Sequence, residues 1–345
     1  MLTTEEQAFL DGPVQQLLDM IDDFEIQQGV HIPQDILNFI AKERFYSLII
    51  PKEYGGLEFS PFANSTIVGR IATKSPAVAV SVMVPNSLGP GELLMHYGTK
   101  EQQEQWLPNL AIGKDIPCFA LTSPEAGSDA GAIPDFAIVT KGIYEGEEVI
   151  GLEVTWDKRY ITLAPIATVL GLAFKVYDPQ HILGKEEKLG ITCALIPASH
   201  EGVEIGNRHD PMGVRFYNGT TRGEKVFIPM SFIIGGEKMI GKGWQMLVSC
   251  LGAGRGVSLP AMGAATCQSS LLNTAMYSYV REQFRTPIGK FEGIQGKLAE
   301  MAAKTYITEA MRVLTTEGLS QGIKPSVVTA IAKYHMTEMG REVLE

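Results

Sequence analysis

The sequence predicts an α+β fold in which a helical part, a β-rich part and a second helical part follow one another along the chain. Residues 1–115 and 236–345 carry apolar side chains at helical spacing, whereas residues 116–235 alternate short β-rich runs with turns. No GxGxxG motif follows a strand and opens a helix, so a Rossmann nucleotide site is not indicated. We therefore expect three domains that correspond to these three ranges.

The N-terminal domain, residues 1–115, is predicted to be helical from its first turn. Hydroxyl residues precede acidic residues at its start, which is a helix-capping pattern, and Leu10, Val14 and Leu17 then recur at helical spacing. A Gly-Thr pair at residues 98–99 begins another helix, which we expect to stop near Pro108.

The middle domain, residues 116–235, is predicted to be a β-barrel or β-sandwich, because its strands are short and closely spaced by turns. The C-terminal domain, residues 236–345, is predicted to contain three long helices in an antiparallel bundle. The last of these helices has no glycine cap or stop signal before Glu345. We therefore expect the bundle to be incomplete and the chain to be truncated at its C-terminus.

Composition excludes several classes of function. The net charge is −10, from 29 basic and 39 acidic residues, which argues against nucleic acid as a partner. The four cysteines are far apart and the six histidines are scattered, so we expect buried thiols and neither a disulfide framework nor a metal site. The longest apolar stretch, residues 161–174, is too short to span a membrane.

The segment ALTSPEAGSD, residues 120–129, joins an apolar run to a cluster of hydroxyl residues, proline and glycine. Two interpretations are open. The cluster is a simple turn after a strand, or its N–H and hydroxyl groups hold a polar ligand such as a phosphate or a flavin edge. The residues alone favour the turn, because such clusters mark turns in most proteins.

Five stretches in order carry a family resemblance: IPKEYGG (50–56), GTKEQQEQWLPNLAIGK (98–114), LTSPEAGSD (121–129), KRYIT (158–162) and REQFRTPIGKFEGIQ (281–295). With the three-domain order, they resemble the acyl-CoA dehydrogenase family, and most closely its large bacterial members of fatty-acid β-oxidation. Those proteins are longer at both ends and have apolar, membrane-associating segments upstream. The resemblance therefore implies a cytoplasmic protein that associates with the bacterial inner membrane through segments absent here.

The resemblance implies FAD as the cofactor, with residues of the loop and of the KRYIT strand around it. Groups at Leu121 and Thr122 would face the polar edge of the flavin ring, and Thr162 would donate near flavin N5. Ser128 would lie near the FAD pyrophosphate and the pantetheine of the substrate. Aromatic surface against the ring would come from Phe119 and Tyr160, for which the residues alone favour an ordinary core role.

Three residues of the C-terminal domain also acquire roles from the resemblance. Arg281 would reach the pyrophosphate of the FAD in a neighbouring subunit, where a guanidinium suits phosphate, and Phe284 would pack on the same cofactor. Arg255 would lie beside the acyl pocket and contact the substrate; a role in holding bundle helices together is equally open.

Departures from the family pattern occur at four positions: Ser123 stands where the family usually has glutamate, Glu125 and Arg285 where it has glycine, and Glu292 where it has glutamine. No catalytic residue is assigned within the chain. One branch of the family places its catalytic glutamate at the position that Gly254 occupies here, and the other branch places it beyond the third bundle helix, past Glu345.

The implied reaction is α,β-desaturation of a fatty acyl-CoA thioester, with electrons passing to an electron-transferring flavoprotein. The implied assembly is a homodimer or a homotetramer. Two alternatives stay open: an acyl-CoA oxidase that passes electrons to oxygen, and a non-catalytic flavin-binding fragment. No nucleic acid and no membrane span in this chain are expected.

Overall fold

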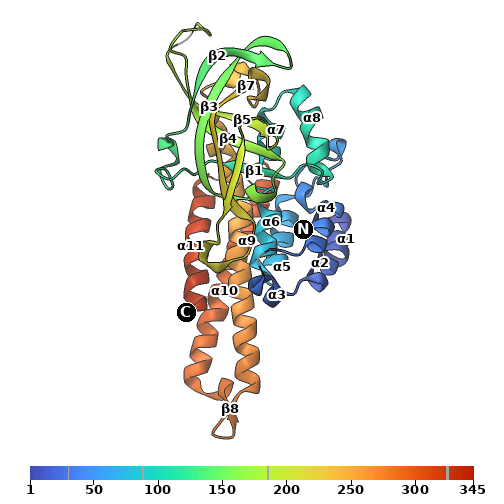
Figure 1. Ribbon diagram of the computed structural model, residues 1–345. Coiled ribbons are helices and arrows are strands. Elements are labelled where there is room, and N and C mark those ends of the chain that lie inside the picture. Colours follow the sequence, from blue (N-terminus) through green and yellow to red (C-terminus); the bar gives the residue numbers. More distant parts are fainter. Residues whose placement is uncertain (30, 88, 185, 324–325) are drawn as a thin grey trace. The chain divides into compact units, whose positions relative to one another are not determined.

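The computed structural model describes residues 1–29, 31–87, 89–184, 186–323 and 326–345. The chain forms two compact units (Figure 1). The helical unit comprises Met1–Ile21, Phe59–Val80 and Gly252–Glu345, and the sheet unit comprises Asp22–Glu58 and Ser81–Leu251. Each unit combines segments that lie far apart in the sequence, and the domain boundaries expected near residues 115 and 235 stay predictions.

Helices, strands and helices follow one another along the chain, which confirms the predicted fold class. The first helices are α1 (Thr4–Phe9), α2 (Gln15–Met20), α3 (Asp23–Gln28), α4 (Gln34–Lys42), α5 (Pro61–Ala72), α6 (Pro76–Met83), α7 (Pro90–Tyr97) and α8 (Lys100–Ala111). The strands of the middle part are β1 (Pro117–Ala120), β2 (Phe136–Tyr144), β3 (Glu147–Thr162), β4 (Val169–Tyr177), β5 (Lys188–Pro197), β6 (Glu204–Arg208) and β7 (Asn218–Pro229). The last elements are α9 (Gly243–Val280), β8 (Glu282–Gln283), β9 (Thr286–Pro287), α10 (Glu292–Ser320) and α11 (Ser326–Leu344).

The first turn of α1 is capped as the sequence predicts. The Thr3 hydroxyl accepts from the Glu6 N–H at 3.2 Å, and the Glu6 carboxylate accepts from the Thr3 N–H at 2.7 Å. The second Glu6 oxygen accepts from the N–H of Ser60 at 2.7 Å, so a buried carboxylate joins the starts of α1 and α5. Burial alone would raise the pKa of Glu6, but the hydrogen bonds from Thr3 and Ser60 outweigh it and hold the pKa below 4.5.

The substitution Glu6→Gln is expected to lower the free energy of unfolding by about 1–3 kcal/mol at pH 7, because it weakens two charge-assisted hydrogen bonds. A folded-state pKa below the unfolded value means that this stabilisation is complete above pH 4.5 and is lost as the pH falls through the folded-state value. Urea unfolding of the wild-type protein and of Glu6→Gln at pH 7 and near pH 3 measures the difference between their free energies of unfolding. This difference is expected to be smaller near pH 3. Glu5→Gln, at an exposed acid of the same turn, is the control.

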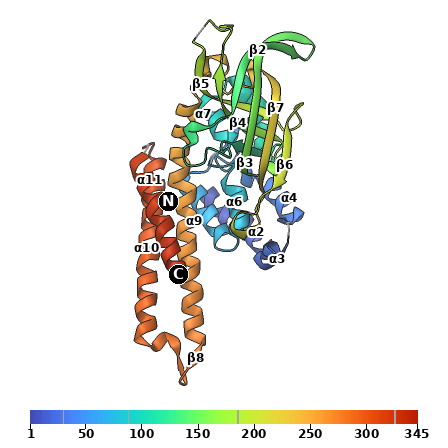
Figure 2. The same ribbon diagram turned by 60° about the vertical axis from the view of Figure 1, so that its left-hand side comes forward.

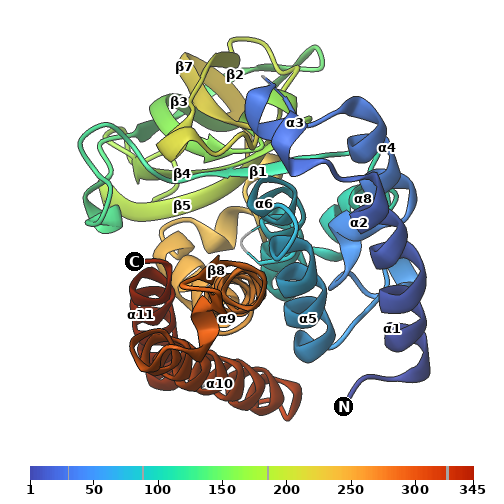
Figure 3. The same ribbon diagram turned by 90° about the horizontal axis from the view of Figure 1, so that it is seen from below.

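The helical unit is built around α5, α9, α10 and α11 (Figure 3). Arg312 on α10 is buried; its guanidinium donates to Glu309 and to the hydroxyls of Ser65 and Thr66 on α5. At Gly256 on α9 an added Cβ would lie 2.6 Å from a side-chain atom of α11, so glycine allows α9 and α11 to approach closely. The long helices are therefore joined by both polar contacts and close packing.

Helix α9 ends at Val280, and the chain forms the short hairpin β8–β9 before α10 (Figure 2). Pro287 has no N–H to donate to a continuing helix, and Phe284 and Arg285 adopt φ values of 53° and 60° at the turn. The helix that follows the Thr99 cap was expected to stop near Pro108, but it passes this residue and continues to Ala111.

The sheet unit contains one mixed seven-stranded sheet with the order β1-β4-β2-β3-β7-β6, and β5 pairs with β4. Both β1 and β2 are parallel to β4: Ala120 pairs with Leu172, and Phe136 pairs with Lys175. The antiparallel strand β5 accompanies β4 from Val169 to Tyr177. The segment 121–135 therefore leaves the sheet and returns to the same strand a few residues further along.

An apolar core fills the sheet unit, with buried residues from α7, α8, β1, β4 and β5. The four cysteines are buried thiols, as expected, and burial raises the pKa of Cys118 and Cys193 to about 12. Within the described part of the chain, no helix is both long enough and apolar enough to cross a membrane.

Candidate functional site

The segment 121–124 runs beside the end of β3 and is hydrogen-bonded to it at successive residues. The Lys158 ammonium donates to the Leu121 carbonyl at 2.8 Å, and the Arg159 N–H donates to the Thr122 carbonyl at 3.0 Å. The Arg159 guanidinium donates to the Pro124 carbonyl at 2.9 Å. The loop with the hydroxyl cluster is thus more than a turn after β1: it is attached along the strand that carries Tyr160 and Thr162.

A buried ion pair lies under this attachment. Lys158 is fully buried, and its Nζ lies 2.5 Å from Asp135 Oδ2 and 3.1 Å from Ser123 Oγ. The Ser123 hydroxyl also donates to Asp135 Oδ2, and Asp135 Oδ1 accepts from the Asp157 N–H at 2.9 Å. Burial lowers the pKa of Lys158, and the neighbouring Asp135 carboxylate opposes this shift.

Sequence reasoning missed Lys158 and Asp135. A signal for Lys158 was present, because Leu152, Val154 and Trp156 alternate as the buried residues of β3 and Lys158 continues the same parity. A lysine at a core-facing position needs a partner. No local pattern in the sequence identifies Asp135 as that partner.

Hydrogen bonds join Leu121 and Thr122 to Lys158 and Arg159, and Tyr160 and Thr162 follow on the same strand. Ser128 is exposed further along the same loop. Phe119 on β1 is buried in the core, and its ring lies over Gly171, the residue that faces it on β4; a Cβ there would be 2.5 Å from the ring. The contacts of these residues with a cofactor stay predictions.

The backbone at Tyr160 is strained. Its φ is 56°, an uncommon value for a residue other than glycine, and the pairing of β3 with β7 shifts register between Lys158 and Ile161. The half-exposed Tyr160 ring lies 4.4 Å from the His209 ring, centroid to centroid. Strain of this kind often marks functional sites, and here it redirects an aromatic side chain beside the loop.

Polar atoms near Tyr160 and Thr162 are suited to a ligand. Asn218 faces Thr162 across the β3–β7 pairing and donates to its hydroxyl oxygen at 3.4 Å, which leaves the Thr162 proton available as a donor. Among the described residues, Asn218 Oδ1 and His209 Nε2 are buried atoms without a hydrogen-bond partner. Since buried polar atoms are nearly always paired, this arrangement fits a polar ring edge such as that of a flavin.

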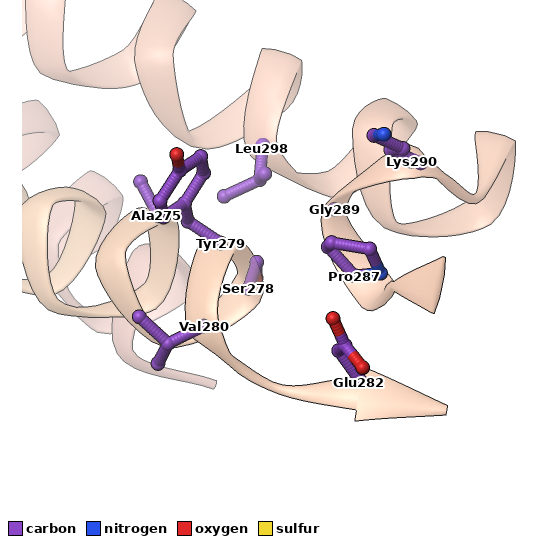
Figure 4. Close-up of a pocket in the computed structure, with 9 residues that line it drawn as sticks. All are labelled: Ala275, Ser278, Tyr279, Val280, Glu282, Pro287, Gly289, Lys290 and Leu298. Atoms are coloured by element: carbon purple, nitrogen blue, oxygen red, sulfur yellow. The ribbon is translucent and has the colours of Figure 1, made fainter. Parts of the chain in front are cut away.

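Arg281 and Phe284 belong to the helical unit, at the β8–β9 hairpin. Arg281 is exposed; its N–H donates to the Tyr277 carbonyl and its carbonyl accepts from the Ile288 N–H, both at 2.8 Å. Phe284 is 92% exposed at the turn. Beside the hairpin, α9 and α10 enclose an open pocket of about 670 Å³ (Figure 4), lined by Ala275, Ser278, Tyr279, Val280, Glu282, Pro287, Gly289, Lys290 and Leu298.

Arg255 is half-buried on α9 in the helical unit. Two groups of predicted site residues therefore exist: one along the loop and β3 in the sheet unit, and one on α9 and the hairpin in the helical unit. The predicted contact of Arg255 with a substrate stays a prediction.

Three family descriptions match successive parts of the chain. They are "Acyl-CoA dehydrogenase, N-terminal domain" over residues 1–114, "middle domain" over residues 118–226 and "C-terminal domain" over residues 241–345. Together they account for nearly all of the sequence.

Individual relatives agree with this match. A 3-(aryl)acrylate reductase of Clostridium sporogenes is 31% identical over 93% of this chain and 80% of its own length. A probable acyl-CoA dehydrogenase FadE10 of Mycobacterium tuberculosis is 29% identical over 98% of this chain, which spans 50% of that relative. The butyryl-CoA dehydrogenase of Megasphaera elsdenii has the same fold, with a TM-score of 0.86 at 20% identity over 99% of this chain and 86% of that one.

Proposed function

Because the chain belongs to the acyl-CoA dehydrogenase family, we propose that it binds FAD and takes part in the α,β-desaturation of fatty acyl-CoA thioesters. The family consists of FAD-binding flavoprotein oxidoreductases, which confirms the predicted cofactor and reaction class at the level of the family. The electron acceptor we propose is an electron-transferring flavoprotein. The place of the reaction in fatty-acid β-oxidation and a cytoplasmic location beside the inner membrane stay predictions.

One observation supports the proposal: residues 121–124 are attached to Lys158 and Arg159, on the strand that continues to Tyr160 and Thr162. The Leu121 and Thr122 carbonyls are used toward β3, so we assign the N–H groups and the Thr122 hydroxyl to the polar edge of the ring. Fixed donors of this kind stabilise developing charge without reorganisation of solvent.

The flavin, when bound, supplies the acceptor for the hydride that leaves the β-carbon. Thr162 would donate its hydroxyl proton near N5, and Asn218 would hold that hydroxyl in orientation through the bond to its oxygen. Tyr160 would cover the ring with an aromatic side chain, in the position that the strained backbone gives it.

The proposal is tested by purifying the protein gently, reducing its flavin anaerobically with dithionite and following flavin absorbance as an oxidant is added. The expected result is a yellow protein whose reduced flavin an electron-transferring flavoprotein reoxidises faster than oxygen does. Because no catalytic residue is assigned within residues 1–345, rapid bleaching by a long-chain acyl-CoA would mean that an acid inside this sequence serves as the base. Faster reoxidation by oxygen would identify an oxidase instead. A protein without flavin absorbance would contradict the proposal.

The substitution Thr162→Ala is expected to shift the flavin midpoint potential while changing the FAD dissociation constant little. A single hydrogen bond contributes about 0.5–1.5 kcal/mol, and this bond would act at the redox-active part of the ring whereas many other contacts hold the cofactor. Dye-coupled reduction gives the potential, and quenching of flavin fluorescence gives the affinity. Thr140→Ala on β2 is the matched control. An equal shift of the midpoint potential in both variants would show that Thr162 does not act at the flavin.

A further inference from the structure

The loop 121–135 is held by two different means. Ala126 and Ile133 in its middle are buried in the apolar core, so packing fixes that part. Its ends are held by polar contacts: Leu121 and Ser123 at the first end and Asp135 at the last meet at the ammonium of Lys158. The residues next to the predicted flavin edge therefore depend on Lys158, together with Arg159, which donates to the Thr122 and Pro124 carbonyls.

Apolar packing at the first end involves Leu121, which packs against the core, and leaves open space beside Pro124. A crevice of about 280 Å³ lies beside it, lined by Pro124, Glu125, Pro134, Asp135, Phe136, Thr155, Trp156 and Asp157. Pro124 and Pro134 border this open space, so apolar contacts there leave the loop room to shift. The directional bonds at Lys158 restrict such a shift.

The hydrogen-bonding capacity of Lys158 is fully used. An ammonium has three N–H donors, and Lys158 has three acceptors: the Leu121 carbonyl, Ser123 Oγ and Asp135 Oδ2. Asp135 is itself fixed, because its Oδ1 accepts from the Asp157 N–H and its carbonyl accepts from the Lys175 N–H, each at 2.9 Å. The ion pair thus connects the loop to β3 and β4 with a defined geometry.

Stability alone does not account for such a pair, because an apolar pair of similar volume is often as stable or more stable in a core. What an apolar pair lacks is direction. We propose that Lys158, neutralised by Asp135 and bonded to Ser123, is a positioning residue that holds Leu121 and Thr122 at a fixed distance from Thr162, which lies on the same strand as Lys158. This inference rests on the proposed FAD site.

The test separates positioning from folding by neutralising both partners. Lys158→Met with Asp135→Asn leaves no unpaired charge and keeps an acceptor for the Asp157 N–H. We expect this double variant to melt near the wild type but to bind FAD about tenfold more weakly, with a shifted midpoint potential. The matched control is Lys141→Met with Glu148→Gln, which neutralises an exposed lysine–glutamate pair between β2 and β3.

A second variant relocates the carboxylate. Ser123→Asp with Asp135→Asn puts the negative charge on the loop side of Lys158, where Ser123 Oγ lies 3.1 Å from Nζ. We expect it to recover most of the FAD affinity and potential. Ser123→Ala, a small change that removes one acceptor, keeps the test decisive if the double variant does not fold; its FAD affinity is expected to fall about two- to fivefold, the effect of a weak hydrogen bond.

The outcomes are distinct. If Lys158→Met with Asp135→Asn and Ser123→Ala both keep the wild-type FAD affinity and flavin midpoint potential, the positioning role is overturned and the proposed FAD site still stands. If the wild-type protein itself binds no FAD, the proposed function fails and this inference fails with it. Recovery of FAD affinity in Ser123→Asp with Asp135→Asn, together with wild-type affinity in Lys141→Met with Glu148→Gln, supports Lys158 as the residue that positions the loop.

Discussion

Asp135→Ala is expected to lower the free energy of unfolding by about 3–5 kcal/mol at pH 7, the cost of leaving one member of a buried ion pair without its partner. The ammonium of Lys158 is fully buried, and the variant also removes the acceptor of the Asp157 N–H. Urea unfolding at pH 7 measures the loss. Asp157→Ala, which breaks an exposed pair with Arg222, is expected to cost less than about 1 kcal/mol.

The loss in Asp135→Ala is expected to depend on pH. Burial already lowers the pKa of Lys158 below 10.5, and removing the carboxylate lowers it further. Between the folded-state and unfolded-state values the unfolded chain binds more protons, so the stability of the variant rises with pH in that window. A deficit below about 1 kcal/mol at pH 7 would show that the pair contributes little, as surface pairs do.

Arg281→Ala is expected to raise the FAD dissociation constant about 10- to 100-fold, because a hydrogen bond to a charged group contributes about 1.5–3 kcal/mol. Backbone hydrogen bonds to Tyr277 and Ile288 hold residue 281 in place, so the substitution removes the guanidinium and leaves the hairpin formed. This prediction rests on the proposed FAD site and on assembly into a homodimer or homotetramer.

The cross-subunit role is measured by diluting the holoprotein and following flavin release together with sedimentation. We expect release to track dissociation of the oligomer, and to occur at higher protein concentration in Arg281→Ala. Lys290→Ala, at an exposed cation that lines the pocket of Figure 4, is the control. Equal FAD retention by Arg281→Ala and the parent at every concentration would contradict the role.

The features that could be predicted from the sequence are local ones. Thr3 and Glu6 lie within one helical turn, so their capping box is visible as a pattern. Apolar spacing likewise distinguishes the helical ends of the chain from its β-rich middle. The end of α9 at Val280 has no such local signal, because Pro287, which cannot continue a helix, lies seven residues beyond it in a hairpin.

The site could be predicted only in part, for a physical reason. The alternation of buried residues along β3 places Lys158 in the core. Its partner Asp135 is brought there by the pairing of β2 with both β3 and β4. The bond between Asn218 and Thr162 similarly depends on the register of β3 with β7. Long-range pairing of this kind leaves no trace in the spacing of nearby residues.

The parallel pairing of β1 and β2 with one strand has a consequence for protein engineering. Ala120 and Phe136 are fixed opposite Leu172 and Lys175, so the two ends of the intervening segment are about 10 Å apart along β4 whatever lies between them. The sheet therefore supplies a frame into which segments of other lengths and sequences can be grafted, provided that they keep Ser123 and Asp135 for Lys158 and the core residues Ala126 and Ile133. Lengthening such a segment costs little chain entropy, about 0.6 kcal/mol for each doubling.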